Sequence, residues 1–183
     1  VSGEGKTFCS INLATVFALS DKKTVIVGLD LRKPRIFDDF QIDNVTGVVN
    51  YLIGQKTIDE VIQSTHVPFL DVISSGPIPP NPSELLMGEA MKEMIEELKL
   101  KYDYIVLDTP PVGLVSDALE LSQFCDATIY VTRQGFTKKG MLGVVNEKHK
   151  RGELHNISIL FNGFKNDVRY GYGYAYGYGV YGE

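Results

Sequence analysis

The segment that most constrains the fold is GEGKT, Gly3 to Thr7, which is followed, after Phe8, by the run CSINLATVFALS. This run has helical periodicity, so the glycines form a turn that opens a helix. Glycine backbone at such a turn lets successive N–H groups converge on a phosphate at the positive end of the helix. Lys6 would then reach the β- and γ-phosphates of a nucleotide, and the Thr7 hydroxyl would bind Mg²⁺. A glycine turn that only caps a helix is the competing interpretation.

Two aspartates at strand ends favour the phosphate-binding interpretation. YIVLD, which ends at Asp108, has the apolar run and terminal carboxylate of a strand that holds Mg²⁺, often through water. VIVGLDLRKP places Asp30 beyond another strand. An aspartate beside the γ-phosphate can assist Mg²⁺ or accept a proton from an attacking hydroxyl. For Asp30 the alternative is a solvated strand end with a surface charge pair.

Strands and helices alternate along the chain. Strands are expected near residues 23–31, 69–74, 102–108, 126–132 and 157–162, and helices near 9–20, 83–101, 117–121 and 138–151, with two short helices joined at Gly54. Asn81 and Pro82 are expected as the N-cap and first residue of the helix that follows, with Glu84 closing the cap. The pattern predicts an α/β P-loop NTPase fold, a doubly wound and mainly parallel sheet flanked by helices. A phosphate loop needs a strand that leads into it, so a first strand is expected upstream of Val1.

Bulk properties exclude several classes of protein. The 183 residues suit one core, and a net charge of −5 gives no reason to expect nucleic acid as a partner. Cys9 and Cys125 lie too far apart for a C-x-x-C motif, and no apolar run reaches the roughly 18 residues that a membrane span needs. His66, His149 and His155 show no spacing typical of metal ligands.

The chain closes with RYGYGYAYGYGVYGE, which holds six of its ten tyrosines. This stretch has too little aliphatic bulk to form a core, so we expect a domain over 1–168 and a flexible tyrosine-rich tail over 169–183. A tyrosine that is phosphorylated must bring its hydroxyl in line with a γ-phosphate, and glycine neighbours leave the backbone free to allow this. The alternative is a low-complexity, self-associating segment.

Five motifs together resemble the bacterial tyrosine kinases of the exopolysaccharide-synthesis type. They are SGEGKT, VIVGLDLRKP, GPIPPNPSELL, VLDTPPVGLVSDA and the C-terminal tyrosine cluster. The resemblance covers residues 1 to 183, and the PPNPSELL segment and the tyrosine cluster are not general features of P-loop proteins.

The resemblance implies a role for each matching residue. Catalysis would depend on Lys6, Asp30 and Asp108, and Mg²⁺ would be held by Thr7, Asp30 and Asp108. The residues that contact ATP would be Gly3, Glu4, Gly5, Lys6, Thr7, Phe8 and Asn162, the last at a position that contacts adenine in related proteins. The phosphate acceptors would be Tyr170, Tyr172, Tyr174, Tyr176, Tyr178 and Tyr181. One departure stands out, because the family's second-strand motif usually carries two aspartates and the first position here is Gly28.

The resemblance also implies a biological setting. It implies an ATP- and Mg²⁺-dependent protein-tyrosine kinase that autophosphorylates between the subunits of a ring-like homo-oligomer. Such a kinase regulates exopolysaccharide or capsule synthesis and export at the cytoplasmic face of the bacterial inner membrane, with this part of the chain soluble. Its partners would be a transmembrane activator or polysaccharide co-polymerase segment and a cognate tyrosine phosphatase.

Two alternatives stay open. The first is a positioning-type ATPase switch of the deviant-Walker group, whose phosphate loop reads KGGxGKT. Alignment on Gly5 to Thr7 puts Val1 at that lysine and Ser2 at the following glycine, so neither position matches. The second is a regulatory module without catalytic activity whose tail docks partners.

Overall fold

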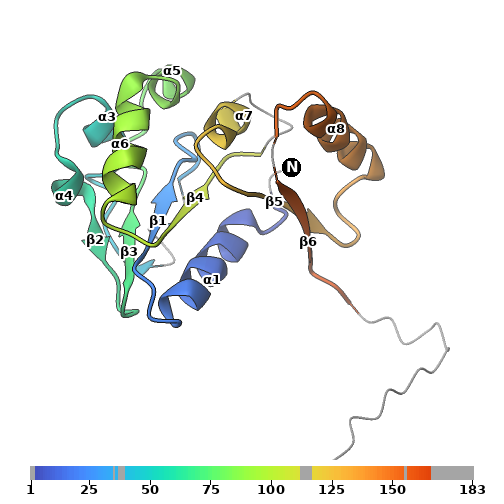
Figure 1. Ribbon diagram of the computed structural model, residues 1–183, viewed down its shortest axis with the longest axis horizontal. Coiled ribbons are helices and arrows are strands. Elements are labelled where there is room, and N and C mark those ends of the chain that lie inside the picture. The colour runs from blue at the N-terminus through green and yellow to red at the C-terminus, as the bar shows by residue number, and fades with distance from the viewer. Residues whose placement is uncertain (1–2, 35, 37–39, 112–116, 155, 166–183) are drawn as a thin grey trace, which may run out of the picture.

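The computed structural model describes residues 3–34, 36, 40–111, 117–154 and 156–165, and its described strands form two sheets (Figure 1). The larger sheet has the order β2 (Gln63–Ser64), β3 (Leu70–Ile73), β1 (Thr24–Gly28) and β4 (Tyr104–Asp108). The smaller sheet pairs β5 (Thr128–Arg133) with β6 (Ile157–Asn162). All pairs are parallel except β2 with β3, so the predicted α/β class and mainly parallel pairing are confirmed.

The central strand β1 sets the position of the functional residues. All five of its residues are buried, as expected for an apolar strand covered on both faces. Thr24 lies opposite Leu70 of β3 and Tyr104 of β4, and Gly28 lies opposite Asp108. This parallel register brings the carboxyl ends of β1 and β4 to one edge of the sheet.

The helices follow the predicted pattern with one correction. They are α1 (Lys6–Ala18), α3 (Val48–Leu52), α4 (Ile58–Val61), α5 (Pro82–Leu86), α6 (Glu89–Lys99), α7 (Asp117–Ser122) and α8 (Lys139–Lys150). The single helix expected over 83–101 is two helices, because Gly88 takes an extended conformation and becomes the N-cap of α6. Asn81 is the N-cap of α5, but its side chain donates to the Glu84 carboxylate at 2.7 Å and makes no hydrogen bond to the helix backbone.

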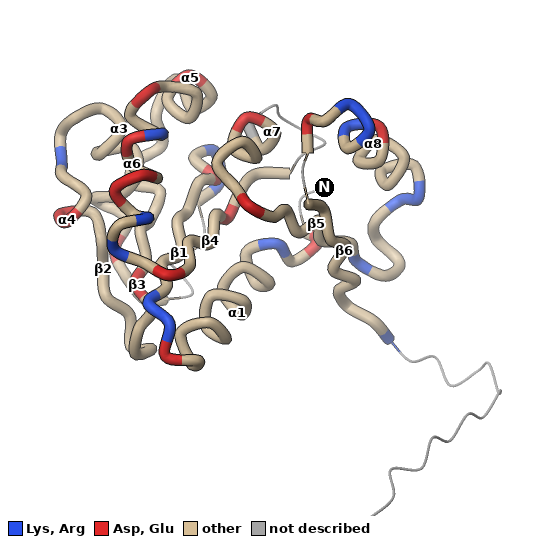
Figure 2. Tube along the Cα trace, in the orientation of Figure 1, with Lys and Arg blue, Asp and Glu red and all other residues tan. Residues whose placement is uncertain are grey.

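Helices cover both faces of the larger sheet (Figure 1). On one face Ala14 and Ala18 of α1 pack with Ile26 and Val72. On the other face Met91, Met94 and other residues of α3, α4 and α6 pack with Val25, Val27 and Ile73. Charged residues lie mostly on the helices and connecting loops (Figure 2). Within the described part of the chain, no helix has the length and apolar character required to cross a membrane.

A pocket of about 690 Å³ separates the two sheets. Its lining includes Ile105 and Leu107 of β4, Ile129 and Val131 of β5, and Phe17 of α1. Among the described strands, β4 pairs only with β1 and β5 only with β6, so the edges that face this pocket carry no partner strand. We call this pocket the β4–β5 slot.

Candidate nucleotide-binding and catalytic site

The loop before α1 has the backbone shape of a phosphate cradle. Gly3 and Gly5 have positive φ angles of 95° and 90°, a conformation that glycine adopts without steric cost. A Cβ at Gly5 would also lie against the side-chain amide of Asn162. Gly5 is the N-cap of the 13-residue helix α1 and has no side chain that could cap it, and the N-terminus of a helix is a favourable place for an anion.

Asp108 connects the end of β4 to the start of α1. Its carboxylate accepts hydrogen bonds from the Thr7 hydroxyl at 2.8 Å and from the Ser10 hydroxyl at 3.1 Å. The side chain is only 5% exposed, and this burial raises the pKa of the Asp108 carboxyl above its ordinary value. The two hydroxyls and the charge of Lys6 act in the opposite direction, and the charge of Asp30 acts with the burial.

The sequence analysis predicted Thr7 and Asp108 for this site and missed Ser10. Ser10 lies three residues after Thr7, so both hydroxyls occupy one face of α1. This spacing was a signal that could have identified Ser10.

The donor atoms at this edge fit a Mg²⁺ ion. Mg²⁺ prefers oxygen ligands and is usually bound through one or two carboxylates together with water and substrate phosphates. The Thr7 hydroxyl and the Asp108 carboxylate are already in contact, directly beside the phosphate loop. A Mg²⁺ ion that arrives with a nucleotide would therefore find both oxygen donors next to each other.

Asp30 lies just beyond the carboxyl end of β1, half-buried, where its Oδ1 accepts the backbone N–H of Lys33 at 3.0 Å. The backbone N–H of Leu29 donates to the Asp108 carbonyl at 2.9 Å, which ties this segment to the end of β4. The structure therefore places the three predicted catalytic residues, Lys6, Asp30 and Asp108, at one edge of the sheet.

The position of the family's first aspartate, Gly28, has little room for a side chain. A Cβ there would lie 3.0 Å from Cγ2 of Ile36 and 3.1 Å from the Ser75 hydroxyl. That hydroxyl donates to the Gly28 carbonyl at 2.8 Å. The space beside Gly28 is therefore filled by an isoleucine and a serine from two other segments.

Residues from β5, β6 and the loop after β5 hold the phosphate loop from the other side. Glu4 is only 1% exposed, and its carboxylate accepts the Thr137 hydroxyl at 2.8 Å. Asn162 donates its side-chain amide to the Glu4 carbonyl, and Arg133 donates to the Gly3 carbonyl, both at 2.9 Å. Thr137 was not predicted, because nothing in its local sequence indicates a contact with a residue 133 positions away.

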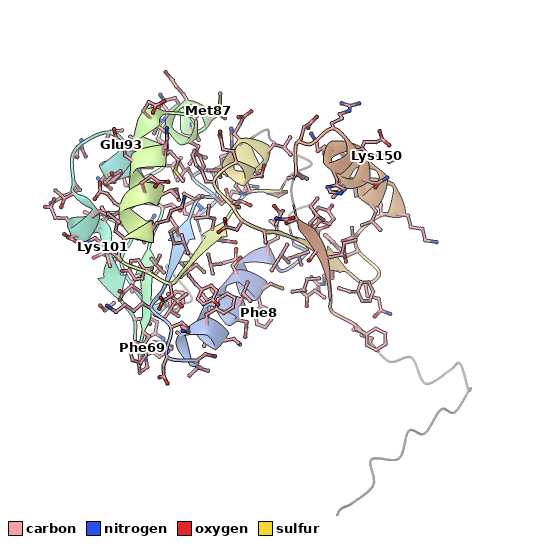
Figure 3. All side chains as sticks on the ribbon, in the orientation of Figure 1. Phe8, Phe69, Met87, Glu93, Lys101 and Lys150 are labelled. Carbon is pink, nitrogen blue, oxygen red and sulfur yellow. The ribbon has the colours of Figure 1, made fainter. Side chains whose placement is uncertain are left out.

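Two predicted nucleotide contacts remain predictions. Asn162 makes its amide hydrogen bond to the phosphate loop itself, and its expected contact with adenine is not tested. Phe8 is 65% exposed on α1, at the position labelled in Figure 3. The six predicted acceptor tyrosines, from Tyr170 to Tyr181, lie outside the described residues, as do His155 and the boundary expected at residue 168.

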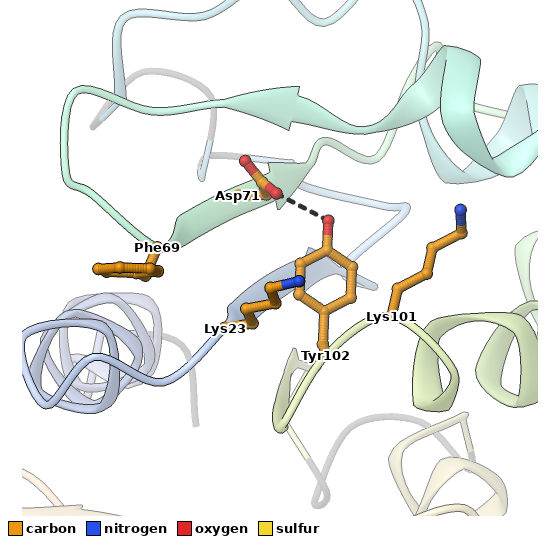
Figure 4. Close-up of a pocket in the computed structure, with 5 residues that line it drawn as sticks. All are labelled: Lys23, Phe69, Asp71, Lys101 and Tyr102. Carbon is orange, nitrogen blue, oxygen red and sulfur yellow. Dashed lines mark hydrogen bonds between the residues drawn. The ribbon is translucent and has the colours of Figure 1, made fainter.

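A second pocket, of about 340 Å³, lies at the opposite edge of the larger sheet (Figure 4). Lys23 and Phe69 precede β1 and β3, and the Tyr102 hydroxyl donates to the Asp71 carboxylate at 2.8 Å. Ligands of open α/β sheets bind at the carboxyl ends of the strands. This pocket lies at the amino ends, so it is not the expected site of the nucleotide.

The chain is similar in sequence and structure to several known proteins. Residues 2–151 match the AAA domain family. The chain is 37% identical over 172 residues to the tyrosine-protein kinase YwqD of Bacillus subtilis (strain 168), covering 93% of this chain and 73% of that protein. It is also similar to the solved kinase domain of the Escherichia coli tyrosine kinase ETK, with 34% identity and a TM-score of 0.86 over 97% of this chain and 69% of that one.

A more distant structural neighbour is not named as a kinase. The septum site-determining protein MinD from Pyrococcus horikoshii OT3, solved with Mg-ADP, has a TM-score of 0.68 and 24% identity over 88% of this chain and 65% of that one. At this identity the likeness concerns the fold alone.

Proposed function

Because the chain belongs to the bacterial tyrosine-protein kinase family, with the fold of an AAA-type P-loop domain, we propose that it transfers the γ-phosphate of ATP to its own C-terminal tyrosines. The acceptors would be Tyr170, Tyr172, Tyr174, Tyr176, Tyr178 and Tyr181. The observation that carries the proposal is the contact of Thr7 with Asp108 beside a glycine cradle, since this arrangement supplies both phosphate and Mg²⁺ ligands.

The proposed roles follow from the positions of the side chains. The backbone N–H groups at the start of α1 and the Lys6 ammonium would bind the phosphates of ATP. Thr7 and Asp108, with Asp30 beside them, would hold Mg²⁺, which when bound neutralises charge on the phosphates. Ser10 and Thr7 fix the orientation of the Asp108 carboxylate.

Asp30 is the proposed acceptor of the tyrosine proton. In the transfer the phenolic oxygen forms a bond to the γ-phosphorus, the bond from that phosphorus to the bridging oxygen breaks, and ADP leaves. The phenolic proton passes to Asp30, since Gly28 supplies no second carboxylate. Phosphoryl transfer through a loose transition state needs little early proton removal, so a single acid is sufficient.

Two tyrosines of the folded domain, Tyr51 and Tyr102, are poor candidates as acceptors, which favours the C-terminal cluster over them. The Tyr51 hydroxyl donates to the Glu97 carboxylate at 2.7 Å and the Tyr102 hydroxyl to Asp71 at 2.8 Å. Burial and these carboxylates raise the pKa of both phenols. A phosphate at either position would place about −1.5 to −2 charges beside a carboxylate.

The setting of the reaction belongs to the same proposal. Tails would be phosphorylated between subunits of a ring-like homo-oligomer, and the added charge would loosen the ring by repulsion. A transmembrane activator or polysaccharide co-polymerase segment would hold the kinase at the cytoplasmic face of the inner membrane. There it would regulate exopolysaccharide or capsule synthesis, opposed by a cognate tyrosine phosphatase.

The second candidate function is a nucleotide switch of the positioning-ATPase type. This chain shares its fold with MinD, but its phosphate loop lacks the lysine of that group. The two functions differ in whether phosphate is found on the tail.

The deciding experiment mixes the protein with a Lys6→Met variant that carries a tail of distinguishable mass. After incubation with Mg²⁺-ATP, mass spectrometry should find phosphate on the tail of the Lys6→Met chain and none on Tyr51 or Tyr102. Alone, the Lys6→Met variant should lose at least about 100-fold in rate, since removal of one such electrostatic group typically costs that much.

Lys99→Met is the matched control, because Lys99 is a surface residue paired only with Glu96 among the ion pairs of the described residues. It should keep the normal rate. Hydrolysis of ATP with bare tails would contradict the kinase and favour the switch.

A further inference from the structure

The last described residues of the chain are held by the side chain of one glutamine. Oε1 of Gln134 accepts the backbone N–H of Lys165 at 2.6 Å, and Nε2 of Gln134 donates to the Lys165 carbonyl at 3.4 Å. The backbone N–H of Gln134 itself donates to the Asn162 carbonyl at 3.0 Å. Gln134 therefore binds both backbone groups of Lys165, the way a neighbouring strand would.

This anchor is continuous with the phosphate loop. Arg133, next to Gln134, donates to the Gly3 carbonyl, and Asn162, three residues before Lys165, donates to the Glu4 carbonyl. Gly163 packs against the Arg133 side chain, since a Cβ there would lie 3.3 Å from Cγ of Arg133. The segment 162–165 is thus fixed at a defined place beside the nucleotide site.

We propose that Gln134 is a positioning residue that fixes where the tyrosine-rich segment leaves the domain, and thereby determines which tyrosines reach an active site. The inference rests on the proposed function. It assigns no catalytic role to Gln134, which acts only through the backbone of Lys165.

Covalent geometry shows why the exit point matters. Tyr170 lies five residues beyond Lys165 and can reach at most about 17 Å, whereas Tyr181 lies sixteen residues beyond and can reach about 54 Å. A domain of this size has a radius of gyration of about 15 Å, so the centres of two touching domains lie roughly 30 Å apart. This distance is within the reach of Tyr181 and beyond that of Tyr170. A linker that cannot span two sites gives an effective concentration near zero.

Release of Lys165 would extend this reach. The last fixed residue would then be Asn162, and Tyr170 could reach about 27 Å. The tyrosines nearest the domain gain most from this change, since the distant ones already reach the site. Loss of the Gln134 anchor should therefore shift phosphate toward Tyr170.

The test places the substitution in the substrate chain only. Wild-type kinase is mixed with Lys6→Met chains that carry, in addition, Gln134→Ala, Gln134→Glu or no further change, and the ratio of phosphate on Tyr170 to phosphate on Tyr181 is measured. Gln134→Ala should raise this ratio at least about threefold, because the added reach brings Tyr170 close to this range. Gln134→Glu should keep the normal ratio, since a carboxylate still accepts the Lys165 N–H.

Two matched controls test whether the shift results from a longer reach of the chain beyond Lys165. Gln123→Ala removes an exposed glutamine that donates only within its own turn, to the Glu120 carbonyl, and should leave the ratio unchanged. Insertion of three residues after Lys165, with Gln134 intact, should reproduce the shift of Gln134→Ala. Hydrogen exchange should show faster exchange of the Lys165 amide in Gln134→Ala than in Gln134→Glu.

A soluble tyrosine peptide added to each mixture tests the kinase function separately from the positioning role of Gln134. If peptide and tails are phosphorylated but the Tyr170 ratio is the same with Gln134→Ala, the positioning role is wrong and the kinase stands. If neither peptide nor tail is phosphorylated, the proposed function is wrong and the inference is overturned with it.

Discussion

Gly28 shows how a single residue departs from its family pattern and how the neighbouring side chains adapt. The family's first aspartate would stand here, and its place is occupied by Ile36 and Ser75. An aspartate at position 28 would therefore press against the side chains of Ile36 and Ser75.

We expect Gly28→Asp to lower the free energy of unfolding by about 1–3 kcal/mol, the usual cost of overpacking. The tyrosine kinase rate should not rise, because the carboxylate cannot take its normal place without moving Ile36. Urea denaturation measures the stability. Gly28→Asp combined with Ile36→Ala should be less destabilised than the sum of the two single variants, and strict additivity would contradict this explanation.

Asp108 shows the cost of a buried catalytic acid. Burial raises its pKa in the folded protein above the unfolded value, so the folded state binds the proton more tightly. The contribution of this group to stability is then present at acid pH and is lost as the pH rises through the folded pKa.

Asp108→Asn should therefore unfold at a higher temperature than the wild type at pH 7 in the absence of nucleotide, and the difference should vanish below about pH 4, where Asp is neutral in both states. Asparagine can still accept from Thr7 and donate to Ser10. Melting curves across this pH range give the result, with the exposed Asp126→Asn as the control that should show no such trend. Kinase activity should be lost.

At the scale of the element, α8 carries glycines that nothing in the described structure requires. Gly143 has a helical backbone and open space around its Cβ position. Gly135, in the loop before α8, also has open space but a φ of +69°.

We expect Gly143→Ala to stabilise the protein by about 0.5–1 kcal/mol, because glycine within a helix costs that much relative to alanine. Gly135→Ala should destabilise it, since alanine at this positive φ is strained. Denaturant unfolding of both variants separates the two effects. Equal stability changes would show that backbone conformation does not decide these positions.

Elements with a strong pattern could be predicted from the sequence, and weak ones could not. The apolar runs of β1, β4 and β6 and the glycine-opened helix α1 follow from local residues. The two-residue strand β2 is too short to show a periodic pattern. The break at Gly88 could not be predicted from local residues, because tertiary packing decides whether this glycine caps a new helix or continues the old one.

The same distinction holds at the site. Lys6, Thr7 and Asp108 belong to local motifs and were predicted. The Thr137 contact with Glu4, the Gln134 anchor and the packing of Ser75 on Gly28 join segments far apart in sequence. Such contacts depend on the arrangement of whole strands, and no local pattern specifies them.

At the scale of the whole molecule, the β4–β5 slot is lined by two strand edges and by apolar side chains of α1. An added apolar strand that runs parallel to β4 and β5 would fit between their unpaired edges. A parallel strand there would join both sheets into one.

A chain extended ahead of Val1 by an apolar strand that fills this slot should therefore be more stable by about 2–5 kcal/mol, the balance of apolar burial against the entropy of ordering a strand. Thermal unfolding measures the gain, and hydrogen exchange should show new protection along β4 and β5. A charged residue in the middle of the added strand serves as the control and should abolish the gain. Unchanged protection of β4 and β5 would contradict this assignment.

The open edges of β4 and β5 affect the solubility of the purified protein. Unpaired strand edges beside apolar surface are templates on which strands of other molecules add. Chains in which the slot is unfilled would therefore associate edge to edge as their concentration rises, in spite of a net charge of −5 that opposes aggregation. The solubility of a preparation is then a sensitive report on whether the slot is filled.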